Sequence, residues 1–255
     1  MTIVKLPPAM SCEKLVGAGT TGFVGLYPGQ TVVKFPHGDA EDIALFQHEA
    51  NVYERFETVR GQPKSLLEYR GKTSNGILLE YAEQGWLRGY LRGENPSPSS
   101  TLLFRWAEQA AEALAYCHAN GVLHGDLNCS DLFLAQSLDL KLGDFATAAM
   151  DEPTPTLYSS AYRLPNAETT SIQTEIFAFG STLFEMATGS APFEHLTDSE
   201  IEGRYRQRRY PQPPHGAALE EIILKCWRLE FDTMDEVLDA IRAECTDPTH
   251  IRATH

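Results

Sequence analysis

The sequence has little that would suit a membrane span, a signal peptide or a nucleic-acid surface. None of its 255 residues lie in a run of about 18 apolar side chains, which a transmembrane helix needs. Residues 1–8 lack the apolar core of a signal peptide. Lysine and arginine number 21 against 35 acidic residues, giving a net charge of −14. Because a nucleic-acid binder needs a basic surface, we expect neither a nucleic-acid nor a membrane partner.

Cysteine is scarce and scattered. The five cysteines are odd in number and show no metal-binding spacing. We therefore expect reduced thiols and an intracellular location, in the cytoplasm, with the nucleus as the alternative. The hydrophobic content of 42% and the charged content of 22% are ordinary for a globular protein. The length suffices for one large domain or two small lobes.

Strand patterns dominate the first third of the chain. Residues 12–34 predict three strands, separated by a glycine-rich turn and a Pro-Gly turn. Apolar residues at three- and four-residue steps predict a helix over 40–58, and two strands are expected near 65–70 and 76–81. This strand-rich part and the remainder suggest two lobes joined near 80–86.

Helix patterns dominate the remainder. A turn or linker at 93–100 precedes a helix predicted over 101–120, which ends at an Asn-Gly stop. A polar stretch at 147–170 is followed by an apolar helix over 173–189, and further short helices complete the chain. We find no internal repeat.

Two short polar segments carry three carboxylates, Asp126, Asp131 and Asp144. Apolar runs at 132–134 and 138–142 separate them, and the second run alternates as a half-buried strand does. The pattern predicts a hairpin with acidic groups at its open end. Such a cluster suits a divalent metal with phosphate, because hard cations prefer oxygen ligands. The alternative is three solvated loop carboxylates.

A glycine-rich turn and two charged residues lie upstream. Gly17, Gly19 and Gly22 punctuate a turn that leads into a strand rather than a helix, which argues against a dinucleotide-binding fold. Such a turn lets backbone N–H groups approach phosphates closely. Lys34 closes an apolar strand and could simply reach solvent. Glu49 lies on the predicted helix among apolar neighbours, where it could pair with Lys34.

Together, these motifs resemble the eukaryotic protein kinase family. The family has a glycine loop, a strand lysine, a helix glutamate, an H-R-D-x-x-x-x-N loop and D-F-G, and all five have counterparts here in that order. Residues 174–180, 183–193 and 225–227 resemble later family segments. The resemblance covers about residues 12–245. The sequence of residues 124–130 also resembles that of a divergent group of fungal kinase-like proteins.

The resemblance implies an α+β, bilobal kinase-like fold. A small antiparallel-sheet lobe with one main helix would occupy about residues 12–82, and a mostly helical lobe about 83–250. Residues 1–255 would then form a single kinase-like domain. Its partner would be a protein substrate or a binding partner, and the oligomeric state stays open.

The resemblance also assigns roles to individual side chains. Lys34 would hold the α- and β-phosphates of ATP and pair with Glu49. Asp126 would be the catalytic base, while Asp131 and Asp144 would bind Mg²⁺. Phosphoryl transfer requires such positioning and neutralisation of the developing charge.

Further nucleotide contacts are implied at the glycine loop, at both faces of the adenine ring and at the hinge between the lobes. They are Gly17, Gly19, Gly22, Val24, Val32, Leu79, Glu80, Ala82 and Phe133.

Four positions depart from the family pattern. Gly125 replaces the arginine that grips a phosphorylated activation loop, and Asn128 replaces a lysine that would stabilise the transferring phosphoryl group. Asp131 replaces a metal-binding Asn, and Ala146 replaces a glycine after Phe145. Val32 and Phe133 also add volume around adenine, and overfilled sites cost about 1–3 kcal/mol. These changes favour weak nucleotide binding.

Three functions are compatible with this sequence. The first is a protein kinase directed at Ser or Thr, and the second is a pseudokinase that acts as a binding or scaffolding module. The third is a small-molecule kinase of the aminoglycoside or choline type, in which His-Gly-Asp-Leu is common; segments 175–180 and 191–193 argue against it.

Arginines cluster at 204, 206, 208 and 209 on this acidic chain. A solvated helix face is one interpretation. A docking site for an acidic or phosphorylated partner is the other.

Overall fold

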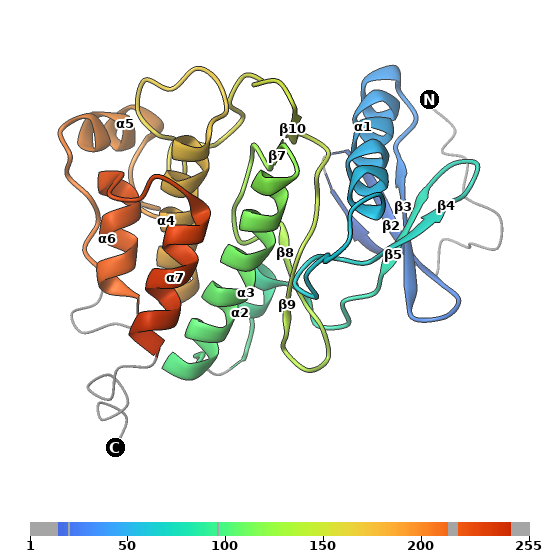
Figure 1. Cartoon of the computed structure of the whole chain (residues 1–255), viewed down its shortest axis with the longest axis horizontal. Helices are drawn as coiled ribbons and strands as arrows, with labels where there is room; N and C mark the ends of the chain where they lie inside the picture. Colours follow the sequence, from blue (N-terminus) through green and yellow to red (C-terminus); the bar gives the residue numbers. More distant parts are fainter. Residues whose placement is uncertain (1–14, 20, 96, 214–218, 246–255) are drawn as a thin grey trace.

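The first lobe is a twisted antiparallel sheet covered by one helix (Figure 1). The structure, a computed structural model, describes residues 15–19, 21–95, 97–213 and 219–245. The strand order in the sheet is β1-β2-β3-β5-β4. The elements are β1 (Leu15–Ala18), β2 (Gly22–Tyr27), β3 (Thr31–Pro36), α1 (Ala40–Glu57), β4 (Tyr69–Lys72) and β5 (Ile77–Glu80).

Helix α1 confirms the helix predicted over 40–58. It begins at Asp39, whose side chain accepts a hydrogen bond from the Asp42 N–H at 2.8 Å. Such a cap satisfies a donor that the helix itself leaves unpaired. Tyr53 and Phe56 are buried, whereas Ile43, near the helix start, is 48% exposed. The apolar pattern therefore marks the core face only from the middle of α1 onward.

The strand predicted at 65–70 is wrong in its first half. Residues 65–67 are buried but belong to a connection, and β4 begins only at Tyr69. Leu66 forms an isolated parallel bridge with Leu142, and the Leu67 N–H donates to the Leu142 carbonyl at 2.9 Å. This apolar run thus bonds to a strand of the other lobe rather than to β5.

The second lobe is built around α4, whose apolar residues are buried on nearly every face. Helix α6 packs against α4, and α7 packs against α3 (Figure 1). These helices confirm the predictions over 101–120 and 173–189, whereas the short α2 was not predicted. The elements are α2 (Leu87–Arg92), α3 (Ser100–Ala119), α4 (Ile172–Thr188), α5 (Asp198–Arg206), α6 (Glu220–Arg228) and α7 (Met234–Cys245).

A small hairpin lies between α3 and the sheet of the first lobe (Figure 1). Leu132 pairs with Leu142, so Asp131 and Asp144 flank the open end of the hairpin. The Gly143 N–H donates to the Asp131 carbonyl at 2.9 Å and closes that end. The predicted acidic hairpin is therefore confirmed. Its strands are β8 (Leu132–Leu134) and β9 (Leu140–Leu142), with β6 (Gly85–Trp86) beside β8, and β7 (Val122–Leu123) paired with β10 (Ala149–Met150).

The expected α+β, bilobal architecture is thus confirmed. Within the part of the chain that the structure describes, no helix is long and apolar enough to cross a membrane.

Candidate functional site

Three charged side chains from distant parts of the chain meet between the lobes. Lys34 Nζ, on β3, lies 2.6 Å from Glu49 Oε2 on α1 and 2.7 Å from Asp144 Oδ1 after β9. The side chain of Glu49 is completely buried. The pair predicted between Lys34 and Glu49 is confirmed, and Asp144 joins it.

Burial and charge act in opposite directions on these groups. Burial would lower the pKa of Lys34, but Glu49 and Asp144 raise it above its ordinary value. Burial raises the pKa of Glu49, a shift that Lys34 only partly offsets. Burial would also raise the pKa of Asp144, but Lys34 lowers it. The ammonium therefore stays charged and favours an ionised Asp144.

Phe145 fixes the position of Asp144 relative to α1. Its ring is buried, with its centroid 5.3 Å from that of Tyr53 and 5.5 Å from that of Phe56. Both contacts have the edge-to-face geometry that aromatic rings favour. The backbone of Asp144 itself has a φ of +62°, which is uncommon for a residue with a side chain. Apolar packing thus orders the acidic segment beside the helix that carries Glu49.

Asp126 lies in a loop that is fixed by polar contacts of the two residues before it. The Gly125 N–H donates to Glu175 Oε1 at 3.0 Å, and His124 Nε2 lies 3.0 Å from the Gly143 carbonyl oxygen. Burial raises the pKa of Asp126 to about 6. A carboxylate with this pKa is ionised at neutral pH, yet it is a better proton acceptor than an ordinary aspartate.

Glu175 supports this loop from the first turn of α4. It is fully buried, lies 2.5 Å from His118 Nε2 and accepts a hydrogen bond from the Tyr158 hydroxyl at 3.2 Å. Burial would raise the pKa of Glu175, but His118 lowers it. No pattern in the sequence links Glu175 to His118 or Tyr158. Their contacts span 57 and 17 residues, so no local pattern reveals them.

Asp131 turns back onto its own loop. Its Oδ2 accepts hydrogen bonds from the Asn128 N–H at 3.0 Å and from Asn128 Nδ2 at 2.7 Å. Burial, followed by the charges of Asp144 and Asp126, raises the pKa of Asp131 well above its ordinary value. Asn128 therefore binds the neighbouring carboxylate here, where the family has a lysine.

The donor set fits a hard divalent cation only in part. The described residues contain no group of three or more His, Cys, Asp or Glu side chains that could hold a metal ion. Asp131 and Asp144 supply carboxylate oxygens, which Mg²⁺ prefers, and a cation would relieve their mutual repulsion, which adds to burial in raising the pKa of Asp131. Since Mg²⁺ usually takes one or two carboxylates plus phosphate oxygens, these two residues fit Mg²⁺ bound with a nucleotide.

The glycine loop joins β1 and β2 above this site. The Gly19 N–H donates to the Gly22 carbonyl at 2.8 Å, and Gly17 pairs with Val24 across the strands. A Cβ atom at Gly22 would lie 2.2 Å from a backbone oxygen of β3, so only glycine fits there. Val24 pairs in turn with Lys34. The loop, Val24 and the lysine are therefore neighbours, as expected.

The residues expected around adenine are mostly covered. Val32 pairs with Leu79, and both are buried, as is Ala82 just beyond the end of β5 at Glu80. Phe133 is half-buried. The narrow adenine slot expected from the larger Val32 and Phe133 stays a prediction.

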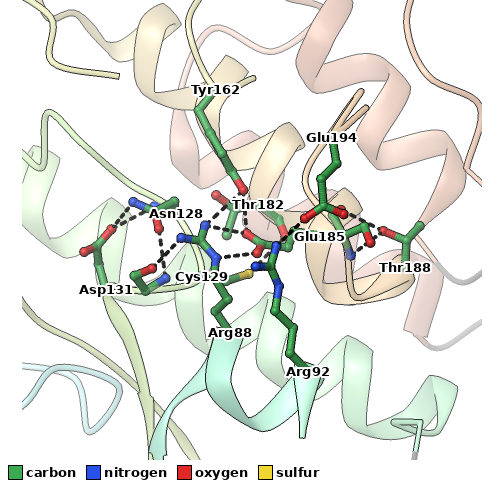
Figure 2. Close-up of polar contacts among 12 residues, drawn as sticks. Arg88, Arg92, Asn128, Cys129, Asp131, Tyr162, Thr182, Glu185, Thr188 and Glu194 are labelled. Atoms are coloured by element: carbon green, nitrogen blue, oxygen red, sulfur yellow. Dashed lines mark hydrogen bonds and ion pairs between the residues drawn. The ribbon is translucent and has the colours of Figure 1, made fainter. Parts of the chain in front are cut away.

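A polar cluster that the sequence did not reveal lies beside the loop that carries Asn128 and Asp131 (Figure 2). Arg88 on α2 contacts Glu185 on α4 through two hydrogen bonds of 2.6 and 2.9 Å. Its Nη1 also donates to Ser130 Oγ at 2.6 Å, and the Tyr162 hydroxyl donates to Glu185 Oε2 at 2.5 Å. Glu185 is buried, so Arg88 neutralises a charge that water cannot reach. The cluster fastens the loop to α2 and α4.

Comparisons with known proteins agree with this geometry. Residues 30–236 match the family model of protein tyrosine and serine/threonine kinases. The chain is similar to the serine/threonine-protein kinase A-Raf of Homo sapiens, at 25% identity over 214 residues. It is also similar to the serine/threonine/tyrosine-protein kinase HT1 of Arabidopsis thaliana, at 28% identity over 181 residues.

These matches cover much of this chain but only part of each relative. The A-Raf match covers 75% of this chain and 34% of the relative, and the HT1 match covers 64% and 46%. The chain therefore spans less than half the length of these two proteins.

Proposed function

The chain belongs to the protein tyrosine and serine/threonine kinase family, and from this premise we propose that it transfers the γ-phosphate of ATP to a Ser or Thr hydroxyl of a protein. The carrying observation is the contact of Lys34 with both Glu49 and Asp144. This contact brings the lysine, the main helix and the acidic segment together, so that no large rearrangement precedes binding. The activity we propose is weak, because Val32 and Phe133 add volume where the family has smaller residues around adenine.

Lys34 and Glu49 orient the nucleotide in this proposal. Lys34 is charged and lies beneath the glycine loop, so its ammonium would bind the α- and β-phosphates. Glu49 would keep that ammonium in place. Backbone N–H groups of the loop around Gly17, Gly19 and Gly22 would cover the phosphates. The hinge backbone from Glu80 to Ala82 would bind the adenine edge.

Asp126 acts as the base. Its carboxylate accepts the proton of the substrate hydroxyl, whose oxygen forms a bond to the γ-phosphorus while the bond to the β–γ bridging oxygen breaks. Asp131 and Asp144 would hold Mg²⁺, which neutralises charge on the phosphates. Because Asn128 replaces the family's lysine, it supplies no positive charge to the transferring group, which supports a low rate.

We also propose the domain extent, the location and the partner class of this kinase. Residues 1–255 form one kinase domain, with lobes at about 12–82 and 83–250. The protein acts inside the cell, in the cytoplasm. Its partners are proteins rather than nucleic acids, as the net charge of −14 favours.

A scaffolding role is the second candidate, and the hydrogen bonds of Asn128 favour it. Its side chain is committed to Asp131 at 2.7 Å and to the Asp126 carbonyl at 2.9 Å. A loop that satisfies its own polar groups in this way can persist without nucleotide. In this case the domain presents a surface to a partner and transfers no phosphate.

Thermal unfolding with added ligand separates the two candidates. The midpoint is measured with ATP, with Mg²⁺ and with both, for the wild type and for Lys34→Ala. We expect Mg²⁺ and ATP together to raise the wild-type midpoint and to have no effect on the variant, since binding to the native state stabilises it. Lys72→Ala, an exposed lysine on β4 paired with Glu54, is the matched control and keeps the shift.

Absence of any shift at millimolar ATP would contradict the kinase proposal and favour the scaffold. If ATP binds, transfer of labelled phosphate to a protein mixture is compared in wild type and Asp126→Asn. Unchanged phosphate transfer by Asp126→Asn would rule out Asp126 as the catalytic base. Phosphorylation of amino alcohols without any protein phosphorylation would point to a small-molecule kinase.

A further inference from the structure

A pocket with an unpaired arginine lies in the helical lobe, apart from the proposed nucleotide site. The segment 163–168 forms one wall, and α5 forms the other through Glu202 and Arg206. The pocket has a volume of about 260 Å³. Figure 1 shows α5 at the end of the molecule that is farthest from the sheet, beside the loop that leads from β10 to α4.

Arg163 is the unusual member of this pocket. Its side chain is half-buried, and its Nε is buried without a hydrogen-bond partner. Among the described residues, no carboxylate forms an ion pair with it. Buried donors are nearly always satisfied, so a buried N–H group without an acceptor is costly. An acceptor from outside the chain would remove this cost.

The opposite wall offers a second guanidinium. Arg206 Nη2 donates to Glu202 Oε2 at 2.8 Å, one turn away on α5. This bond neutralises Glu202, while a guanidinium has five donors and so keeps others for a ligand. Glu168 is exposed at the pocket. Among the described residues, Arg163 is therefore the guanidinium of the pocket that has no carboxylate partner, and its Nε is a buried donor without an acceptor.

Positive charge continues outside the pocket. Arg204, Arg208 and Arg209 are exposed at the C-terminal end of α5. Arg204 lies over the ring of Phe193 at 5.3 Å, while Arg208 and Arg209 form no ion pair with other described residues. On a chain of net charge −14, this concentration of arginine is exceptional. This basic surface would attract acidic residues of a partner that flank a group bound in the pocket.

We propose that this pocket binds the phosphate of a phosphorylated Ser or Thr in a partner protein. A phosphoryl group carries close to two negative charges and three acceptor oxygens, so it can bond both Arg163 and Arg206. A carboxylate satisfies fewer donors, and an acidic chain is repelled by an anionic membrane. The inference goes beyond the proposed function, because it involves neither Lys34 nor Asp126.

The test uses a fluorescein-labelled peptide with one phosphoserine among alanine and glutamate, and its unphosphorylated form. Affinity is measured by fluorescence anisotropy, and the arginine Nε–H signals are followed by NMR. The Nε–H signal of Arg163 is the one that disappears in Arg163→Gln. We expect this signal to shift when the phosphorylated peptide is added, but not when the unphosphorylated peptide is added. Arg163→Gln and Arg206→Gln should each weaken phosphopeptide binding about tenfold or more. Arg60→Gln, an exposed arginine outside both the pocket and α5, changes it less than about twofold.

Several results would overturn the proposal. They are equal binding of the unphosphorylated peptide, undiminished binding by both variants, or inorganic phosphate binding as tightly as the peptide. Binding to vesicles of anionic lipid that depends on Arg163, with no peptide binding, would assign the pocket to a membrane instead. If Arg163→Gln does not fold, Arg206→Gln decides the question, together with the difference in wild-type affinity between the phosphorylated and the unphosphorylated peptide.

Discussion

Lys34 and Asp144 lie 110 residues apart in the sequence, yet Nζ of the lysine donates to Oδ1 of the aspartate at 2.7 Å. The same ammonium contacts Glu49, so one lysine neutralises a buried carboxylate and orients a second. The two lobes are thereby tied together at the site we propose for ATP.

Replacement of Lys34 by methionine should destabilise the fold. Glu49 would keep a charge with no counterion in a fully buried position, and breaking such a pair costs about 3–5 kcal/mol. Urea unfolding at neutral pH measures this decrease in the free energy of unfolding. Lys72→Met removes a pair with Glu54 in which both side chains are about half exposed, so it should cost less than about 1 kcal/mol. Equal losses in both variants would contradict this account of Glu49.

The pKa of Asp126 predicts a pH-dependent effect of its removal. Because the pKa is raised to about 6 in the native state, ionisation of Asp126 opposes folding. Stability from this group is present at low pH and is lost as pH rises through about 6. Asp126→Asn should therefore be more stable than wild type at pH 7.5, by roughly 2–3 kcal/mol, with the difference vanishing near pH 4.

Urea unfolding across this pH range tests the Asp126 prediction. Glu94→Gln, which removes an exposed carboxylate, should show no such pH-dependent difference in stability from the wild type. If Asp126→Asn is less stable than wild type at every pH, then the carboxylate makes native contacts that outweigh its burial.

The sequence predicted the elements that depend on local pattern. The acidic hairpin and the pair of Lys34 with Glu49 followed from apolar alternation, helical spacing and family resemblance. The contact of Arg88 with Glu185 did not, because it joins a short helix to a helix 97 residues later. The first half of the strand predicted at 65–70 failed for a similar reason, since its backbone bonds to β9. Interactions between distant elements depend on the assembled fold and leave no periodic signal.

Arg88→Met should destabilise the helical lobe strongly. Glu185 is completely buried and would keep the hydrogen bond from the Tyr162 hydroxyl but lose its counterion, so we expect the free energy of unfolding to fall by about 3–5 kcal/mol. Arg92→Met is a matched control on the same helix (Figure 2). Its pair with Glu194 is also 2.6 Å long, but both side chains are well exposed, and its loss should cost less than about 1 kcal/mol.

A double variant tests the cause of the Arg88 effect. Arg88→Met combined with Glu185→Gln removes both charges, so it should be more stable than Arg88→Met alone. If the second substitution lowers stability further, packing of the arginine stem rather than the unpaired carboxylate accounts for the loss.

Restoring a side chain at Gly125 should harm the protein. Its φ is +83°, and a Cβ atom would lie 2.8 Å from the Thr147 carbonyl oxygen. We expect Gly125→Ala to cost about 1–3 kcal/mol in thermal or urea unfolding. Gly29→Ala is the control, because its φ is +77° but nothing lies within 4 Å of the added atom. The difference between the variants measures the steric contact, and equal costs would show that Thr147 moves aside without penalty.

Asp131→Asn should separate the stability of the loop from its metal binding. Burial and the neighbouring Asp144 and Asp126 raise the pKa of Asp131, so a neutral amide at this position should raise the midpoint of thermal unfolding without ligand. The same change removes a carboxylate oxygen, so the further shift on adding Mg²⁺ and ATP should shrink. Asp139→Asn is the control in the same hairpin. A hydrogen bond from the Ser137 side chain lowers the pKa of Asp139, so a neutral amide there should not raise the midpoint of thermal unfolding. A lower midpoint for Asp131→Asn, with an undiminished magnesium effect, would mean that this carboxylate serves the loop through Asn128 rather than the metal.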